Sequence, residues 1–149
     1  MIYVKRPDAS LVFVNRELPE GFADKDLIAM AKLEVMKQKT EGFIPLVPAI
    51  VLHKNGKVLC KTVPSLSALI GRPATGDTLL GALKSALVME GISFSKLRSF
   101  CLEGLISTRE NDCFILLSAQ LNQDYIPGKE QSLIAFDSAT LYALFLMGT

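Results

Sequence analysis

The 149-residue sequence contains a single histidine, His53, and only three cysteines. One histidine gives little support to a His-rich metal site, or to the Ser–His and Cys–His arrangements of nucleophilic catalysis. The cysteines, Cys60, Cys101 and Cys113, stand alone in apolar, strand-like sequence. They lack the paired spacing of a metal site and the even number of a disulfide framework, so we expect buried free thiols.

The sequence also lacks an excess of one charge and any long apolar run. The 16 basic and 15 acidic residues give a net charge of +1, which indicates neither a nucleic-acid-binding surface nor an acidic tail. The apolar stretches fall short of the ~18 residues that a membrane helix needs. Residues 1–10 lack the apolar core of a signal peptide. We expect a cytoplasmic protein with no nucleic-acid partner and no membrane partner.

Half of the residues are hydrophobic and 21% are charged. A chain of this length is long enough to bury a sizeable core in one domain. No repeat, low-complexity tract or linker divides it. We therefore expect a single domain over residues 1–149.

The N-terminal part predicts two strands and a helix. Residues 2–5 and 11–14 are predicted as a pair of short strands around the turn formers Arg6-Pro7-Asp8. A helix is predicted over residues 24–38, with Asp24 as its N-cap and with Gly42 ending the segment.

Residues 43–63 predict a β-hairpin, because Asn55-Gly56 separates two apolar runs and both residues adopt positive φ at low cost. Pro45 and Pro48 cannot donate to a ladder, so they mark the first strand as an edge strand or as irregular at its start.

A second strand pair is predicted over residues 97–106 and 113–121. A last strand over 133–136 and a helix over 139–147, capped by Asp137 or Ser138, complete the chain. Hairpins mixed with helices, without regular βαβ alternation, predict an α+β fold in which helices cover a mixed sheet.

The stretch from Gly71 to Ile92, GRPATGDTLLGALKSALVMEGI, predicts a loop that leads into one amphipathic helix. Asp77 or Thr78 is a suitable N-cap for this helix, and Gly91 a suitable residue to end it. A core helix between two turns accounts for all of these features.

This stretch also resembles the loop–helix–loop box of the Nudix hydrolases. In that family a glycine, five residues and a glutamate open the box, and here Gly71 and Asp77 occupy those positions. The triplet Gly76-Asp77-Thr78 is similar to the family's Gly-Glu-Thr. The resemblance covers residues 43–149 and implies a Nudix-like mixed β-sheet packed between helices. Residues 1–42 would then be an N-terminal strand and helix extension.

The resemblance is weakest at the acidic residues. The family's helix carries an Arg-Glu pair and, two residues later, a Glu-Glu pair, whose carboxylates bind Mg²⁺ or Mn²⁺ and so activate water. Here Ser85-Ala86 and Met89-Glu90 stand at those positions, and one residue is missing between Glu90 and Gly91. Only Glu90 keeps a carboxylate. The resemblance implies Glu90 as the catalytic residue of any active form, and Glu90 with Glu130 as its metal ligands.

Gly71, Arg72 and Asp77 are the candidate ligand-binding residues. Arg72 precedes the helix start, where free amide hydrogens favour a phosphate. Structural alternatives stay open: Arg72 as a solvated loop residue, Asp77 as a cap, and Glu90 as a solvated acid at the helix end.

Three functions follow from this sequence. The first is a protein that binds a nucleotide-like ligand or a partner without efficient hydrolysis, and that needs no cofactor. The second is a hydrolase of nucleoside diphosphate-linked compounds that uses Mg²⁺ or Mn²⁺ and relocated acids drawn from Glu90, Glu130 and Asp112. The third is an interaction module whose apolar residues 141–148 pack against a second copy in a homodimer.

Overall fold

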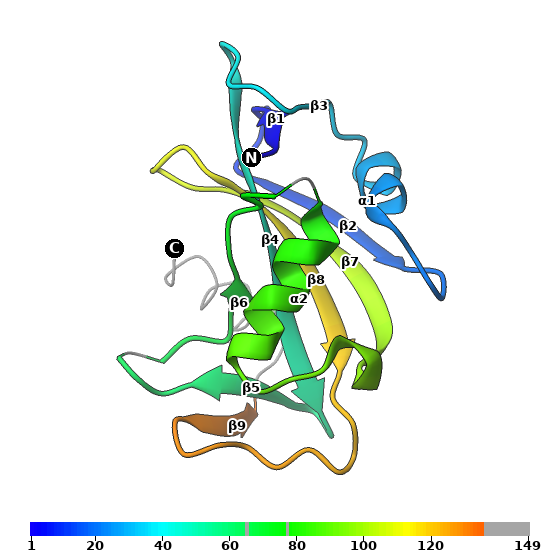
Figure 1. The fold of residues 1–149 in the computed structure, drawn as a ribbon, viewed down its shortest axis with the longest axis vertical. Helices are drawn as coiled ribbons and strands as arrows, with labels where there is room; N and C mark the ends of the chain where they lie inside the picture. Colours follow the sequence, from blue (N-terminus) through cyan, green and yellow to red (C-terminus); the bar gives the residue numbers. More distant parts are fainter. Residues whose placement is uncertain (65, 77, 136–149) are drawn as a thin grey trace.

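A computed structural model describes residues 1–64, 66–76 and 78–135. These residues form an α+β fold in which nine strands make one sheet and two α-helices accompany it (Figure 1). One pair of neighbouring strands runs parallel and the others antiparallel, so the sheet is mixed. The predicted fold class is confirmed.

The long strand β4 (Phe43–Lys54) organises the sheet. Strand β8 (Cys113–Gln120) runs parallel to it along one edge, from the pair Leu46–Cys113 to the pair His53–Gln120. Three short strands share the other edge in antiparallel pairing: β1 (Tyr3–Lys5), β6 (Ile70–Gly71) and β5 (Lys57–Lys61). The remaining strands lie further out: β7 (Arg98–Ser107) beside β8, β2 (Leu11–Glu17) beside β7, β3 (Val35–Met36) beside β1, and β9 (Gln131–Ala135) beside β5.

The two prolines do not make β4 an edge strand, contrary to one of the two expectations. The amide of Leu46 donates to the carbonyl of Ile2 in front of β1. By the alternation of a strand, the nitrogen of Pro48 faces that same edge, between the segments that pair with β1 and with β6. The nitrogen of Pro45 faces the β8 edge, one residue before that register begins. Each proline therefore stands where no ladder bond is required of its nitrogen.

Both predicted strand pairs after residue 42 are confirmed. Strands β4 and β5 are joined at Asn55 and Gly56, with φ of 53° and 74°, as the Asn-Gly signal requires. Strands β7 and β8 pair antiparallel, as predicted, with two register shifts.

The N-terminal predictions are corrected in two respects. Strands β1 and β2 pair with β4 and β7 instead of with each other. The helix α1 (Asp24–Met30) ends eight residues earlier than predicted. Lys32 adopts a left-handed φ of 53°, which stops the helix, and Val35 then pairs with Val4 of β1. Pairing in the sheet prevails over a weak helical pattern.

Apolar side chains cover both faces of the sheet. On one face, Ile50 and Leu52 of β4 belong to a buried cluster with Leu83 and Leu87 of the helix α2 (Leu79–Met89), which crosses the sheet in Figure 1. Leu27 of α1 belongs to the same cluster. The opposite face carries a smaller buried cluster: Ala49, Val51, Val58, Cys60, Ala68, Ile106 and Leu116.

The helix predicted over 139–147, its caps Asp137 and Ser138, and the end of the last predicted strand lie outside the described residues. Within the described residues, no helix has the length and apolar character needed to cross a membrane.

Candidate functional site

The N-terminus of α2 is capped from two sides. Thr78 is its N-cap, and the Thr78 hydroxyl accepts from the amide of Gly81 at 3.0 Å. The carboxylate of Asp24, at the start of α1, accepts from the amides of Leu79 and Leu80 at 2.7 and 3.0 Å. Asp24 therefore caps α2 and not its own helix, whose N-cap is Ala23. The first amides of α2 already have acceptors, so they are not free to meet a phosphate beside Arg72.

The C-terminus of α2 ends as predicted at Gly91, which has a φ of +75°. The amide of Ile92 donates to the carbonyl of Leu87, and that of Gly91 donates to the carbonyl of Val88. This pair of bonds is a Schellman motif, and the buried side chain of Ile92 accompanies it. Glu90 is the residue directly before Gly91, so the two bonds of this motif fix its backbone position.

Part of the box-like stretch, its first three residues and three residues near the end of its helix, lines one pocket of about 350 Å³. Its walls come from the end of β5, from β6 with the residues on either side of it, and from the C-terminal half of α2 with its C-cap: Lys61, Leu69, Ile70, Gly71, Arg72, Pro73, Ala86, Met89 and Glu90. Four helix positions were matched above to the charged Nudix residues by resemblance, and three of them line this pocket. In this chain, those three are Ala86, Met89 and Glu90.

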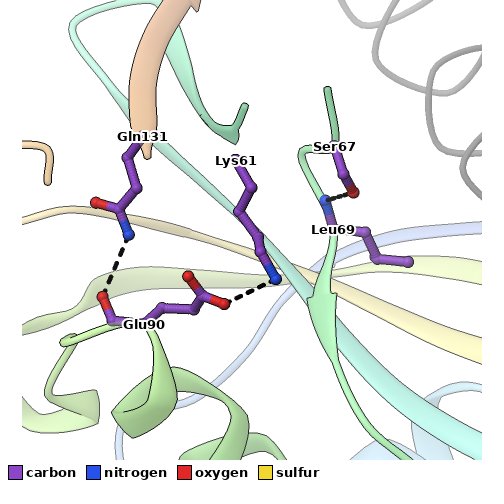
Figure 2. A network of polar contacts seen from close by, with 5 residues as sticks. All are labelled: Lys61, Ser67, Leu69, Glu90 and Gln131. Carbon is purple, nitrogen blue, oxygen red and sulfur yellow. Dashed lines mark hydrogen bonds and ion pairs between the residues drawn. The ribbon is translucent and has the colours of Figure 1, made fainter. Parts of the chain in front are cut away.

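Glu90 is not a free carboxylate in this pocket. Its Oε1 lies 2.8 Å from Nζ of Lys61, the last residue of β5 (Figure 2). The Glu90 side chain is 19% exposed and that of Lys61 is 38% exposed. The ammonium also lies near the C-terminal end of α2, where a positive charge is favourable. Lys61 is not predicted by the sequence, because nothing local relates the end of a hairpin strand to a helix end 29 residues later.

Gln131 holds the same helix end from the other side. Its Nε2 donates to the carbonyl of Glu90 at 3.2 Å (Figure 2). Its Oε1 accepts from the hydroxyl of Tyr125 and from the amide of Gly128. Nζ of Lys54 donates to the carbonyls of Gln123 and Tyr125, which fastens the same loop to the end of β4. The loop between β8 and β9 is therefore tied both to the end of α2 and to the end of β4.

The donor set of the described residues does not fit a divalent cation. Mg²⁺ and Mn²⁺ prefer several oxygen ligands, and Glu90 is the single acid that lines the pocket, already paired with Lys61. Glu130 is exposed in the turn before β9 and does not line the pocket. Asp112 lies in the β7–β8 turn, beside a different cavity. No group of three or more metal-ligating side chains occurs in the described part of the chain. Asp77 lies outside that part.

Gly71 and Arg72 reach the pocket in different ways. Gly71 pairs with Ala49, and a Cβ atom on it would lie 2.5 Å from the carbonyl oxygen of Pro48. This close approach of β6 to β4 is a packing reason for the glycine. Arg72 is exposed at the wall of the pocket, where it adds a second cation to that of Lys61.

The thiols have little nucleophilic character. Burial raises the pKa of Cys113 to about 11, and burial together with the negative charge of Glu103 raises that of Cys101 to about 11. Burial also raises the pKa of Cys60. All three cysteines are free; the expectation of buried free thiols is confirmed for Cys60 and Cys113, whereas Cys101 is half-buried.

No family model and no curated protein sequence matches this chain. Among solved structures, that of Tm1382, a protein provisionally named as a Nudix hydrolase, aligns with 89% of this chain and 88% of its own. The identity is 17% and the TM-score is 0.45. A likeness at this level concerns the course of the chain and says nothing of the chemistry of the pocket.

Proposed function

We propose that this chain is a Nudix-like domain whose pocket binds a nucleotide-like ligand without hydrolysing it efficiently. One observation carries the proposal. The helix positions that would supply acids face a common pocket with Gly71 and Arg72, yet they present Ala86, Met89 and an ion-paired Glu90.

The lost acids matter because a diphosphate is cleaved with the help of a metal that neutralises charge and activates water. A hard cation held by one carboxylate, itself neutralised by Lys61, binds weakly. Metal-assisted hydrolysis is therefore disfavoured. The pocket itself and the positive charges of Lys61 and Arg72 remain available to bind an anion.

The pocket suits a small organic anion better than a macromolecule. Its volume of about 350 Å³ lies at the lower end of the range of small-molecule sites. Cationic side chains and apolar walls occur together in it, which matches a ligand with a phosphate group and a less polar body.

A hydrolysis screen tests this proposal. Nucleoside diphosphate-linked compounds are incubated with the purified chain and millimolar Mg²⁺ or Mn²⁺, and released products are separated by chromatography. We expect no turnover above that of the Glu90→Gln variant. Clear turnover by the natural chain that disappears in Glu90→Gln would overturn the proposal in favour of a hydrolase with relocated acids.

Thermal unfolding with and without metal gives an independent measurement. A cation that binds only the native state raises Tm by mass action. The reference sample is the same protein in buffer with EDTA and no divalent cation, at matched ionic strength. We expect millimolar Mg²⁺ or Mn²⁺ to leave Tm unchanged relative to this reference. A rise specific to one divalent cation would count against the proposal.

A further inference from the structure

We propose that the pocket holds the phosphate or diphosphate group of its ligand directly, through Lys61 and Arg72, with no metal ion between them. This inference rests on the proposed function, since it names the ligand group that the same pocket takes. Among the described residues that line the pocket, two are cationic and one is a carboxylate, so together they bring a net positive charge.

Lys61 is held in place by its backbone. Its amide donates to the carbonyl of Ser67 at 2.7 Å, and the amide of Ser67 donates back at 2.9 Å. On its other side Lys61 pairs with Gln131 of β9. Figure 2 shows the side chain reaching from this strand to the carboxylate of Glu90. The charge is therefore positioned before any ligand arrives, which lowers the cost of binding.

The ammonium of Lys61 retains donors for a ligand. An ammonium has three N–H groups, and within the described part of the chain it is paired with one carboxylate oxygen, Oε1 of Glu90. Lys61 is twice as exposed as Glu90, at 38% against 19%. An oxyanion in the pocket reaches the ammonium without displacing the acid from the helix end.

Arg72 complements this point charge. A guanidinium presents several N–H groups in a plane and binds phosphate oxygens in a bidentate way. Arg72 is exposed at the same wall, directly after the close β6–β4 contact at Gly71. The two cations lie on different segments, so they hold an anion from two directions.

The apolar lining leaves room for the body of the ligand. Leu69, Ile70, Pro73, Ala86 and Met89 share the pocket. Met89 is 77% exposed, and its flexible thioether adapts to flat or irregular apolar groups. A phosphate group on an aromatic or apolar body fits this combination better than a bare inorganic ion.

Glu90 gives the inference a test with a definite sign. If the cations hold the anion, the carboxylate of Glu90 partly neutralises the charge of Lys61 and repels the ligand. Removing its charge then strengthens binding. If a metal on Glu90 held the anion, the same substitution would weaken binding.

The experiment is isothermal titration calorimetry of the full chain with ADP, inorganic pyrophosphate and adenosine, in EDTA and at low ionic strength. We expect ADP and pyrophosphate to bind and adenosine to bind at least about tenfold more weakly, since a hydrogen bond to a charged group is worth roughly 1.5–3 kcal/mol. The Lys61→Met and Arg72→Gln variants should each bind ADP about tenfold more weakly. The Glu90→Gln variant should bind ADP more tightly.

Lys84→Met is the matched control, because it removes one positive charge from α2 outside this pocket, where Nζ lies 5.0 Å from the ring centre of Phe94. We expect it to bind ADP like the natural chain. Circular dichroism verifies that each variant is folded. If Lys61→Met does not fold, Arg72→Gln and Glu90→Gln still decide.

The inference is overturned if ADP and pyrophosphate bind only when Mg²⁺ is added, or if neither binds. It is also overturned if Glu90→Gln weakens binding, or if Lys84→Met weakens it as much as Lys61→Met does. These outcomes concern how the ligand is held, whereas the absence of hydrolysis in the proposed function fails separately, on turnover that disappears in Glu90→Gln.

Discussion

Gly71 pairs with Ala49 of β4 in a contact that leaves no space for a side chain. A Cβ atom at this position would lie 2.5 Å from the carbonyl oxygen of Pro48 and 2.9 Å from Cα and Cβ of Ala49. All of these atoms belong to the backbone of β4 or are attached directly to it, so none moves without shifting the central strand. The glycine therefore lets β6 reach β4 and brings the loop with Arg72 to the pocket.

The Gly71→Ala variant should be destabilised by about 1–3 kcal/mol, the usual cost of overpacking a close contact. Equilibrium unfolding in urea measures this difference. Gly76→Ala is the matched control: it lies in the same loop, its φ is not positive, and a Cβ there meets nothing within 4 Å. Equal stability of the two variants would contradict the packing role of Gly71.

Single residues with a local signal were predictable from sequence. Asn55, Gly56 and Gly91 have positive φ where an Asn-Gly turn and a helix end require it. The ion pair of Lys61 with Glu90 was not, since it depends on how β5 and α2 are placed by the rest of the fold. Local geometry follows from local sequence, whereas the charge balance of the pocket does not.

At the scale of elements, Asp24 links the N-terminus of α1 to the N-terminus of α2. Its two carboxylate oxygens each accept one amide of the first turn of α2, and Thr78 satisfies a third. A negative charge at a helix N-terminus is also favourable to the helix dipole. A short helix with seven residues thus fixes the start of the helix that carries the candidate site.

Asp24→Ala should lower the free energy of unfolding by about 1–2 kcal/mol, the usual effect of losing an N-cap acceptor. The measurement is again urea unfolding, with Lys25→Ala as control because Lys25 is exposed on the same helix. Asp24→Asn keeps one acceptor oxygen and should lose less than Asp24→Ala. If Lys25→Ala loses as much stability as Asp24→Ala, the loss comes from a general effect on α1 and not from the missing cap of α2.

Elements with a strong hydrophobic or turn pattern were predicted well. The end of α1 was not, and the reason is an ambiguous pattern. Residues 31–38 carry apolar positions that fit either a helix or a strand, and Val35 is decided by its pairing with Val4. The order of strands along the edge of β4 has a similar origin. It reflects long-range pairing, which turn residues and periodicity do not specify.

At the scale of the whole molecule, residues 1–42 contribute strands to the sheet and buried side chains to the core. Strands β1 and β2 pair with β4 and β7, which lie on opposite sides of β8 in the strand order. Ile2, Val4, Phe22 and Leu27 are at most 8% exposed and belong to the same cluster as α2. This arrangement bears on whether the segment is the N-terminal extension expected from the sequence or a part of the folding unit.

Deleting residues 1–42 should abolish cooperative folding. Each buried apolar side chain contributes roughly 1.5–3 kcal/mol, and the net stability of a domain is only about 5–15 kcal/mol. The deletion also removes the Asp24 cap and exposes the edges of β4 and β7. Thermal unfolding followed by circular dichroism should show no sigmoidal transition for residues 43–149.

A point variant separates the loss of the core from the loss of chain length. Leu27→Ala in the full chain should cost about 2–5 kcal/mol, because the side chain is 1% exposed and leaves a cavity. Ile126→Ala, at a side chain that is 84% exposed, should cost almost nothing. If residues 43–149 unfold cooperatively on their own while Leu27→Ala is neutral, the N-terminal segment is an appendage. If the deletion fails and Leu27→Ala is destabilised, the first 42 residues are part of the folding unit that holds the pocket in shape.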